Sequence, residues 1–122
     1  MTSPRVELVE QFVDAFNRRD LDRLLQLCHP EIELASPNGD TLRGHEGAAR
    51  WAAKQWNGNT PAEVETDLIE EDGSGVVHHG RLIFRWRETG EVAVSVPVRA
   101  VFTLDADRIA RWEGGPTDDY EP

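Results

Sequence analysis

The 122-residue sequence has one cysteine, few basic residues and no long apolar run, and each absence excludes a class of protein. The single cysteine, Cys28, rules out an internal disulfide and a cysteine-rich metal site. With 13 basic and 23 acidic residues the net charge is −10, which argues against nucleic acid or an anionic membrane as a partner. No segment has the pattern of a membrane span or a secretory signal, so we expect a cytoplasmic protein with no membrane partner.

The first half of the sequence predicts three helices, because apolar residues recur at every third or fourth position. Ser3 and Asp20 can cap the first two helices through their side-chain oxygens. A residue before a proline is pushed out of the helical region, so the second helix should end at His29. The helices are expected from Pro4 onward, from Asp20 to His29, and from Gly44 to about Asn57.

After Pro61 the apolar period changes to two, which is typical of strands. Helices followed by an antiparallel meander indicate an α+β domain with the helices on one sheet face. We expect a single domain over residues 1–122, with a flexible acidic tail at 114–122. The strands are expected at Glu31–Ser36, Ala62–Glu71, Val76–Arg87, Glu91–Leu104 and Arg108–Glu113.

Alternation divides the long strands into a more apolar face and a face that carries several arginines. The apolar face should pack on the helices and line a concave pocket. The arginine face would then be convex, and its apolar residues suit a homodimer contact. Two alternatives stay open: a solvated convex face covered by arginine stems, or exchanged faces with an anion bound by the arginines. The convex residues are Val77, Ile83, Arg81, Arg85, Arg87, Arg99 and Val101.

Residues 6–44 read VELVEQFVDAFNRRDLDRLLQLCHPEIELASPNGDTLRG, in the order helix, helix, strand, turn, and a glycine that opens a third helix. This segment resembles the nuclear transport factor 2-like superfamily, especially its SnoaL-like and ketosteroid-isomerase-like branch. The resemblance implies a cone-shaped, cystatin-like fold, in which three N-terminal helices pack on a strongly curved, mostly antiparallel sheet around one deep pocket. It also implies polyketide-cyclase-like relatives.

The catalytic groups of two branches of that superfamily are absent. The resemblance places the isomerase tyrosine on Phe12, its base on Ser36 and its acidic donor on Ala100, so proton transfer by that mechanism is not expected. The segment RIARWEGG resembles the last strand of the epoxide-hydrolase branch, with Trp112 matching a tryptophan. The water-activating positions of that branch fall on Gly80, Leu82 and Gly114.

His78 is the titratable group that remains on the apolar face, and its ordinary pKa would allow it to act as acid or base. The alternative is a hydrogen-bonded core histidine, and a bulge would exchange it with His79. No histidine or acid spacing indicates a metal, and no cofactor is expected. The expected pocket residues are Phe12, Phe16, Leu34, Ser36, Asn38, Leu82, Phe84, Trp86, Ala100, Phe102 and Trp112.

Three functions fit these features. The first is acid–base chemistry of the isomerase, cyclase or hydrolase type on a small apolar or polycyclic molecule, with His78 as the catalytic residue. The second is a ligand-binding domain without catalysis, which the missing carboxylates favour. The third is a module that binds a protein partner through the mouth of the cone or the convex sheet, which the acidic excess disfavours.

Overall fold

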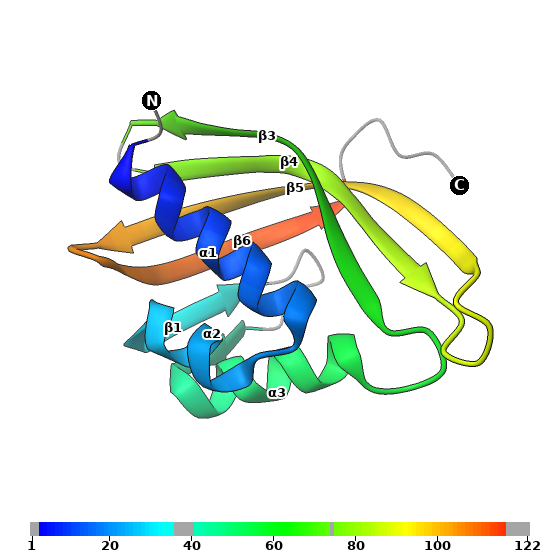
Figure 1. Cartoon of the computed structure of the whole chain (residues 1–122). Helices are drawn as coiled ribbons and strands as arrows, with labels where there is room; N and C mark the ends of the chain where they lie inside the picture. The colour runs from blue at the N-terminus through cyan, green and yellow to red at the C-terminus, as the bar shows by residue number, and fades with distance from the viewer. Residues whose placement is uncertain (1–2, 36–40, 74, 117–122) are drawn as a thin grey trace.

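A computed structural model describes residues 3–35, 41–73 and 75–116. Within them the chain forms three helices and six strands (Figure 1). No helix in this part of the chain is long and apolar enough to cross a membrane. The elements are α1 (Pro4–Arg18), α2 (Leu21–Leu27), β1 (Cys28–Ala35), β2 (Thr41–Arg43), α3 (Gly44–Trp56), β3 (Ala62–Asp72), β4 (Gly75–Arg85), β5 (Val92–Asp105) and β6 (Arg108–Pro116).

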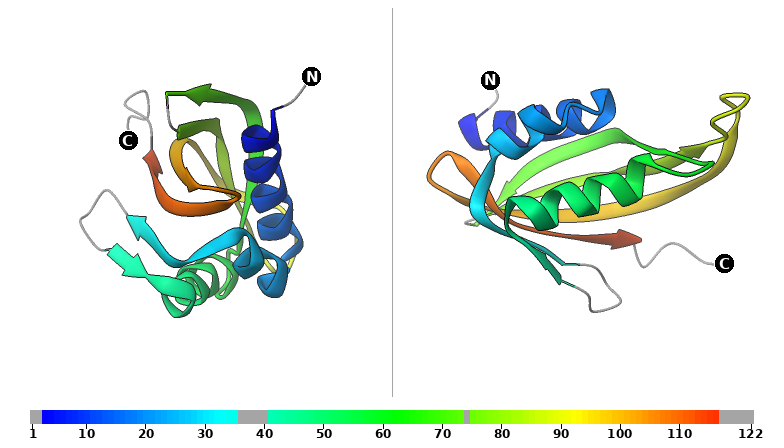
Figure 2. Two further views of the ribbon diagram at one scale, coloured as in Figure 1. Left: turned by 90° about the vertical axis from the view of Figure 1, so that its left-hand side faces the viewer. Right: turned by 90° about the horizontal axis from the view of Figure 1, so that it is seen from below.

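The strands form one sheet in the order β2-β1-β6-β5-β4-β3. All neighbours are antiparallel except β1 and β6, which run parallel. The long strands bend strongly around α1, and the sheet curls without closing (Figure 2). The predicted α+β class, with three helices on a curved and mostly antiparallel sheet, is confirmed.

Side-chain caps fix the start of the first two helices. The Ser3 hydroxyl accepts a hydrogen bond from the Val6 amide at 3.2 Å, and the Asp20 carboxylate accepts one from the Arg23 amide at 3.1 Å. Between these helices Arg19 adopts a left-handed backbone with φ of 57°, which turns the chain sharply. Helix α1 therefore lies across the sheet with one apolar face buried against it.

The core lies between this helix face, α3 and the concave side of the sheet. It continues under β1, where Ile32 and Leu34 are buried beside β6. One histidine, His78, is the buried polar side chain among the described residues. The core residues with the least exposure are Val9, Phe16, Leu24, Cys28, Ile32, Leu34, Ala48, Ala52, Val76, Phe102 and Ile109.

Several element boundaries differ from the sequence prediction. Helix α2 ends at Leu27 and Cys28 already belongs to β1, because a parallel partner in β6 extends that strand. A short strand, β2, follows residues 36–40 and pairs with β1, where the sequence predicted only a turn. Strand β6 runs on to Pro116 beside β5, so the predicted tail at 114–122 is wrong for its first three residues. Residues 117–122 lie outside the described part.

Candidate functional site

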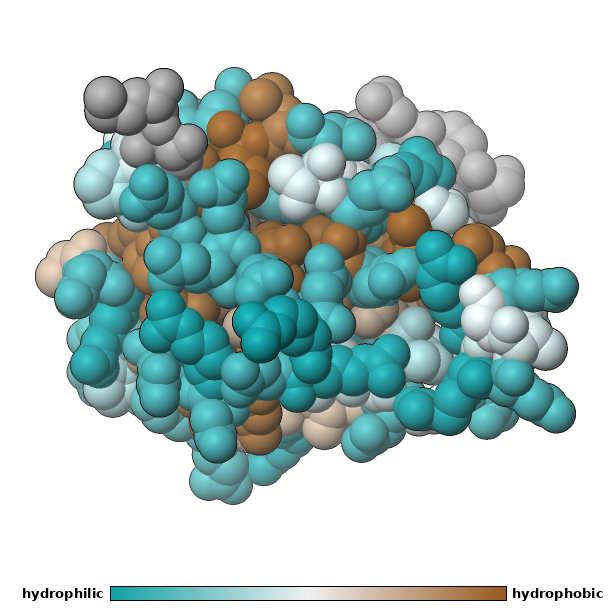
Figure 3. All heavy atoms as spheres, viewed as in Figure 1, coloured by the Kyte–Doolittle hydropathy of each residue, from teal (hydrophilic) through white to brown (hydrophobic). Residues whose placement is uncertain are grey.

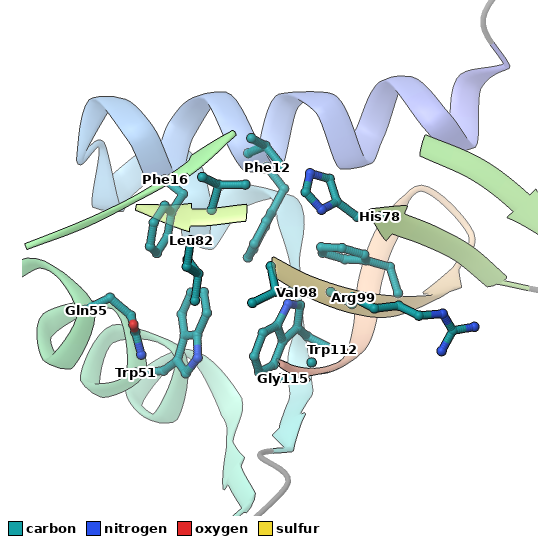
Figure 4. A pocket seen from close by; sticks show the side chains of 15 residues that line it. Phe12, Phe16, Trp51, Gln55, His78, Leu82, Val98, Arg99, Trp112 and Gly115 are labelled. Atoms are coloured by element: carbon teal, nitrogen blue, oxygen red, sulfur yellow. The ribbon is translucent and has the colours of Figure 1, made fainter. Parts of the chain in front are cut away.

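A cavity of about 210 Å³ lies between α1, α3 and the concave face of the sheet (Figure 4). Aromatic and aliphatic side chains from both helices and from the four long strands make up most of its wall. No carboxylate among the described residues lines it. Its lining consists of Phe12, Val13, Phe16, Trp51, Gln55, Val64, His78, Leu82, Val98, Arg99, Ala100, Phe102, Trp112, Gly114 and Gly115.

The cavity exists because the sheet carries small residues where the helices stand over it. In the strand register His78 is opposite Ala100, and Ala100 is opposite Gly114. The next inward row places Gly80 opposite Val98. Larger side chains in these two rows would reach the helices, since paired residues on one sheet face stand side by side. The floor of the cavity therefore includes two small residues, Ala100 and Gly114, and Gly80 lies in the next row.

Two rings lean along their strands onto these glycines. A Cβ at Gly80 would lie 2.8 Å from Cε1 of His78, and a Cβ at Gly114 would lie 2.6 Å from Cζ2 of Trp112. Neither position can carry a side chain while the ring two residues earlier keeps its place. Gly80 also approaches the backbone of β3, because its Cβ would stand 2.0 Å from the carbonyl oxygen of Glu65. The glycines thus fix the orientation of both rings.

Aromatic side chains from four elements, α1, α3, β5 and β6, meet at the cavity wall (Figure 4). The rings of Trp51 and Trp112 lie 5.1 Å apart between centroids, and those of Phe16 and Trp51 lie 5.4 Å apart. Phe12 contacts Phe102 edge-on at 5.4 Å. Tilted and edge-on pairs at these distances are favourable beyond the area that they bury. The wall is consequently rigid and rich in flat surfaces against which a ring can pack.

His78 is 3% exposed and is held by one side-chain hydrogen bond. Its Nε2 lies 2.9 Å from the hydroxyl oxygen of Thr66, and the direction of this bond depends on the tautomer. Burial lowers the pKa of His78, and the nearby charge of His79 lowers it further, while Asp67 acts in the opposite direction. The imidazole is therefore neutral at neutral pH and has one nitrogen that can accept a proton.

A bulge in β3 brings Thr66 to His78. The register places Thr66 opposite Gly80 and Leu68 opposite His79, so Asp67 is an extra residue between them. Residues opposite each other share a face, so Thr66 points to the concave side and Leu68 to the convex side. The bulge thus supplies a hydroxyl partner to the buried histidine from the edge strand of the sheet.

Of the twelve predicted site residues, seven line the cavity, three do not, and two lie outside the described residues. Leu34 is buried elsewhere in the core. Phe84 packs against the core from outside the cavity wall. Ser36 and Asn38 lie outside the described residues. The seven that line the cavity are Phe12, Phe16, His78, Leu82, Ala100, Phe102 and Trp112.

The prediction that Trp86 walls the pocket is wrong. Its side chain is 48% exposed and borders a separate surface hollow of about 430 Å³ with Asn59, Arg87 and Glu88. Alternation assigned Trp86 to the apolar face but carried no information about where the helices end. Beyond that point the apolar face has no helix over it, so the residue stays in solvent.

Several lining residues were not singled out in the sequence. Trp51 is one of them, and it stands at the cavity wall against Trp112. The register of the helices was the available signal: Val13 follows Phe12 on α1, and Gln55 follows Trp51 by one turn on α3. Arg99 borders the cavity, but its guanidinium points away from it (Figure 4).

The opposite sheet face carries ion pairs and hydrogen bonds within the chain. His79 contacts Glu70 at 3.0 Å, and Arg85 contacts Glu63 at 2.5 Å. Arg81 donates from Nε to the Ser95 hydroxyl at 2.7 Å. These contacts place the arginine face on the convex side, as the alternation predicted, and the exchanged arrangement with an anion pocket is wrong. Among the described residues no group of three or more metal-ligating side chains comes together.

Comparison with known proteins gives the family and the fold. The family model of the SnoaL-like domain matches residues 9–112. No curated protein matches. Among solved structures, TerC crystallised with polyporic acid is 22% identical, with a TM-score of 0.78 and 94% of this chain and 92% of that chain covered.

Two further structures share the fold. A cystatin-fold protein from Novosphingobium aromaticivorans is 19% identical, with a TM-score of 0.75 and coverage of 94% of this chain and 99% of that one. An LEH-like epoxide hydrolase of M. tuberculosis is 22% identical, with a TM-score of 0.77 and coverage of 93% and 82%. The cone-shaped fold that the sequence resemblance implied is therefore confirmed. Because its model spans most of the chain, this protein belongs to the SnoaL-like domain family.

Proposed function

We propose that this protein binds a small apolar, ring-bearing molecule in the cavity and moves a proton on it with His78. The observation that carries the proposal is one buried, neutral imidazole in a cavity lined mostly by apolar and aromatic side chains. Such a pocket binds through apolar area, and a few polar groups set the orientation of the ligand. TerC, which shares the fold, was crystallised with polyporic acid.

His78 is suited to accept a proton because burial keeps it uncharged. A base must be unprotonated at the working pH and close to the acidic hydrogen of its substrate. In the proposed step a C–H bond beside a carbonyl breaks, the proton goes to the imidazole, and the electron pair stays on the substrate as an enolate. The amide of Gln55, which also lines the cavity, is a neutral group that can donate a hydrogen bond to the enolate oxygen.

The binding step can be tested with 1-naphthol and naphthalene, which differ by one hydroxyl. Calorimetric titration should show that 1-naphthol binds about fivefold more tightly, as expected for one hydrogen bond of about 1 kcal/mol. His78→Phe should remove that difference and keep the affinity for naphthalene. His79→Phe is the matched control, because the neighbouring imidazole points to the convex face and contacts Glu70. Equal loss in both variants would contradict the assignment.

The proton transfer can be tested without a known substrate, by following deuterium exchange into 2-tetralone in heavy water. This ketone is apolar, has a fused ring and carries acidic hydrogens beside its carbonyl. The protein should accelerate the exchange, His78→Phe should abolish the acceleration, and His79→Phe should preserve it. Binding without any acceleration would sink the catalytic part of the proposal.

The second candidate function is ligand binding without catalysis. It is favoured by the loss of proton-transferring groups at Phe12 and Ala100, both of which line the cavity. It is also favoured by the hydrogen bond that already occupies Nε2 of His78. The exchange experiment separates the two candidates. Docking of a protein partner at the mouth of the cone or on the convex sheet remains an untested alternative.

We further propose that two copies associate through the convex sheet face. Leu68 is 51% exposed there, and Pro97 and Val101 on β5 are partly exposed. Val77 and Ile83 on the same face are already buried within one chain, so the contact would rest on the remaining apolar area. Light scattering at micromolar concentration should give a dimer mass, and Leu68→Glu should give a monomer. A monomer mass for the unaltered chain would reject the proposal.

A further inference from the structure

The apolar face that floors the cavity continues beyond it along β4 and β5. Leu82 lines the cavity and is itself partly exposed, so it stands at the boundary. Opposite it lies Val96, and the next inward pair is Phe84 with Val94. Val94 is 45% exposed. We call the surface formed by Leu82, Val96, Phe84 and Val94 the apolar track.

The track is confined to one side of the hairpin by a bulge. Phe84 is opposite Val94, but the next residue, Arg85, is opposite Val92, so Ala93 is an extra residue in β5. Because opposite residues share a face, Val92 lies on the convex side with Arg85. Two valines with nearly equal exposure, 45% for Val94 and 50% for Val92, therefore lie on opposite faces of the same strand.

The hairpin that carries the outer half of the track is anchored. It extends past the end of α3 (Figure 2), and Arg87 ties it to the loop after that helix. The guanidinium of Arg87 donates to the carbonyl oxygen of Trp56 at 2.7 Å and to that of Gly58 at 2.9 Å. Apolar side chains reach the surface among polar ones over the long strands (Figure 3). In this arrangement the track lies open beside the cavity.

We infer that the apolar track binds a hydrocarbon chain attached to the ring that the cavity holds. The inference rests on the proposed function, since the cavity must take the ring first. From Leu82 to Phe84 the strand spans about 7 Å, which is enough for several methylene groups. The track offers no charge, and it adjoins the cavity wall directly at Leu82. A few side chains are too small a surface for a protein partner, which needs about 800 Å² on each side. The ligand class is thus a ring that bears an alkyl, prenyl or acyl chain.

The test is a series of 4-alkylphenols from 4-ethylphenol to 4-heptylphenol, titrated by calorimetry. Full burial of one methylene would raise the affinity about fourfold. A chain on the open track keeps one side in water, so the affinity should rise only about twofold for each added methylene. Val94→Ser should flatten this gain for the longer chains and leave the affinity for 1-naphthol unchanged. Val92→Ser is the matched control and should keep the wild-type gain.

Each outcome decides the inference. The inference would be overturned if affinity rose equally with chain length in the Val94→Ser and Val92→Ser variants, or if it did not rise with chain length in the wild-type protein. Binding of 1-naphthol in the same experiments would still support the cavity as the site of the ring. A change of oligomeric mass in Val94→Ser, measured by light scattering without ligand, would assign the track to a second copy of the chain and overturn it too. No binding of any phenol or of 1-naphthol would overturn this inference and the proposed function together.

Discussion

The imidazole of His78 lies over Gly80, two residues further along the same strand, and a Cβ at Gly80 would stand 2.8 Å from its Cε1. Space is limited on both sides of Gly80, because the carbonyl oxygen of Glu65 also approaches it from the neighbouring strand. Gly80 thus lies between the backbone of β3 near its bulge and the imidazole of the candidate base, His78. A side chain at this position would disturb both.

Gly80→Ala should destabilise the fold by about 3 kcal/mol, because an added methyl group would overlap backbone that cannot move freely. Urea denaturation of the variant measures the loss. Gly90→Ala is the control, since that glycine has open space around it and only its φ of 79° disfavours a side chain. The control should lose about 1 kcal/mol. An equal loss in both would show that the close approach at Gly80 has no energetic consequence.

Thr66→Val should destabilise the protein by about 1 kcal/mol, since it removes the hydroxyl that shares a hydrogen bond with Nε2 of His78. Thr66→Ser keeps the hydroxyl and should keep the bond. Nitrogen NMR of the imidazole reports the tautomer directly, and the tautomer populations should change in the valine variant alone. Unchanged ring-nitrogen shifts in Thr66→Val would show that this bond does not set the state of the histidine.

Stability should fall as the pH is lowered through the ordinary pKa of histidine, about 6.5. Because burial lowers the pKa of His78 in the folded state, the unfolded chain takes up its proton first. Between the two pKa values the unfolded state binds more protons, so the free energy of unfolding decreases as the pH falls. His78→Gln should lose less stability than the wild type over the same range. Parallel melting curves for the two proteins would contradict this.

Ala100→Phe should fill the cavity and weaken binding of 1-naphthol at least tenfold. Ala100 is part of the floor, and its Cβ already lies 3.1 Å from where a Cβ at Gly114 would stand. Overpacking costs about 1–3 kcal/mol, so folding is checked by circular dichroism before titration. Ala93→Phe, an exposed position on the same strand, should leave binding unchanged. Wild-type affinity in a folded Ala100→Phe protein would place the ligand elsewhere.

The thiol of Cys28 should not react with a disulfide reagent in the folded protein. Burial raises its pKa to about 12, so almost no thiolate forms at mildly alkaline pH, and the side chain is fully buried. Denaturation in guanidinium chloride should release one reactive thiol per chain. Reaction of the native protein at the rate of the unfolded chain would show that β1 opens readily.

Alternation in the long strands predicted the two sheet faces and favoured the inward side for His78, with an exchange with His79 left open. It predicted this face correctly because β4 stays regular across the cavity, from His78 to Leu82. The bulges at Asp67 and Ala93 could not be predicted, because an extra residue in one strand is defined only by its partner strand. The hydrogen bond between Thr66 and His78 could therefore not be predicted from the sequence.

The sequence also did not indicate how far along the sheet the helices extend. The alternating apolar residues of β5 predicted burial from Val94 to Leu104. Val94 is nevertheless 45% exposed, because the β4–β5 hairpin extends beyond the helices. The same reason explains the error at Trp86. Several cavity residues on α1 and α3 were not predicted. Helical periodicity indicates which face of a helix is buried, but not which part of that face borders a cavity. The cytoplasmic location and the homodimer remain predictions.

The parallel pairing of β1 with β6 determines when this chain can finish folding. Leu34 is opposite Trp112, and Ala35 is opposite Glu113, so residues almost eighty positions apart must meet. During synthesis the three helices and β1 are made long before their sheet partner exists. The apolar side of α1 and the inner side of β1 have no complete sheet to pack on until the last strand has left the ribosome. Non-local pairing of this kind slows folding and exposes apolar surface meanwhile.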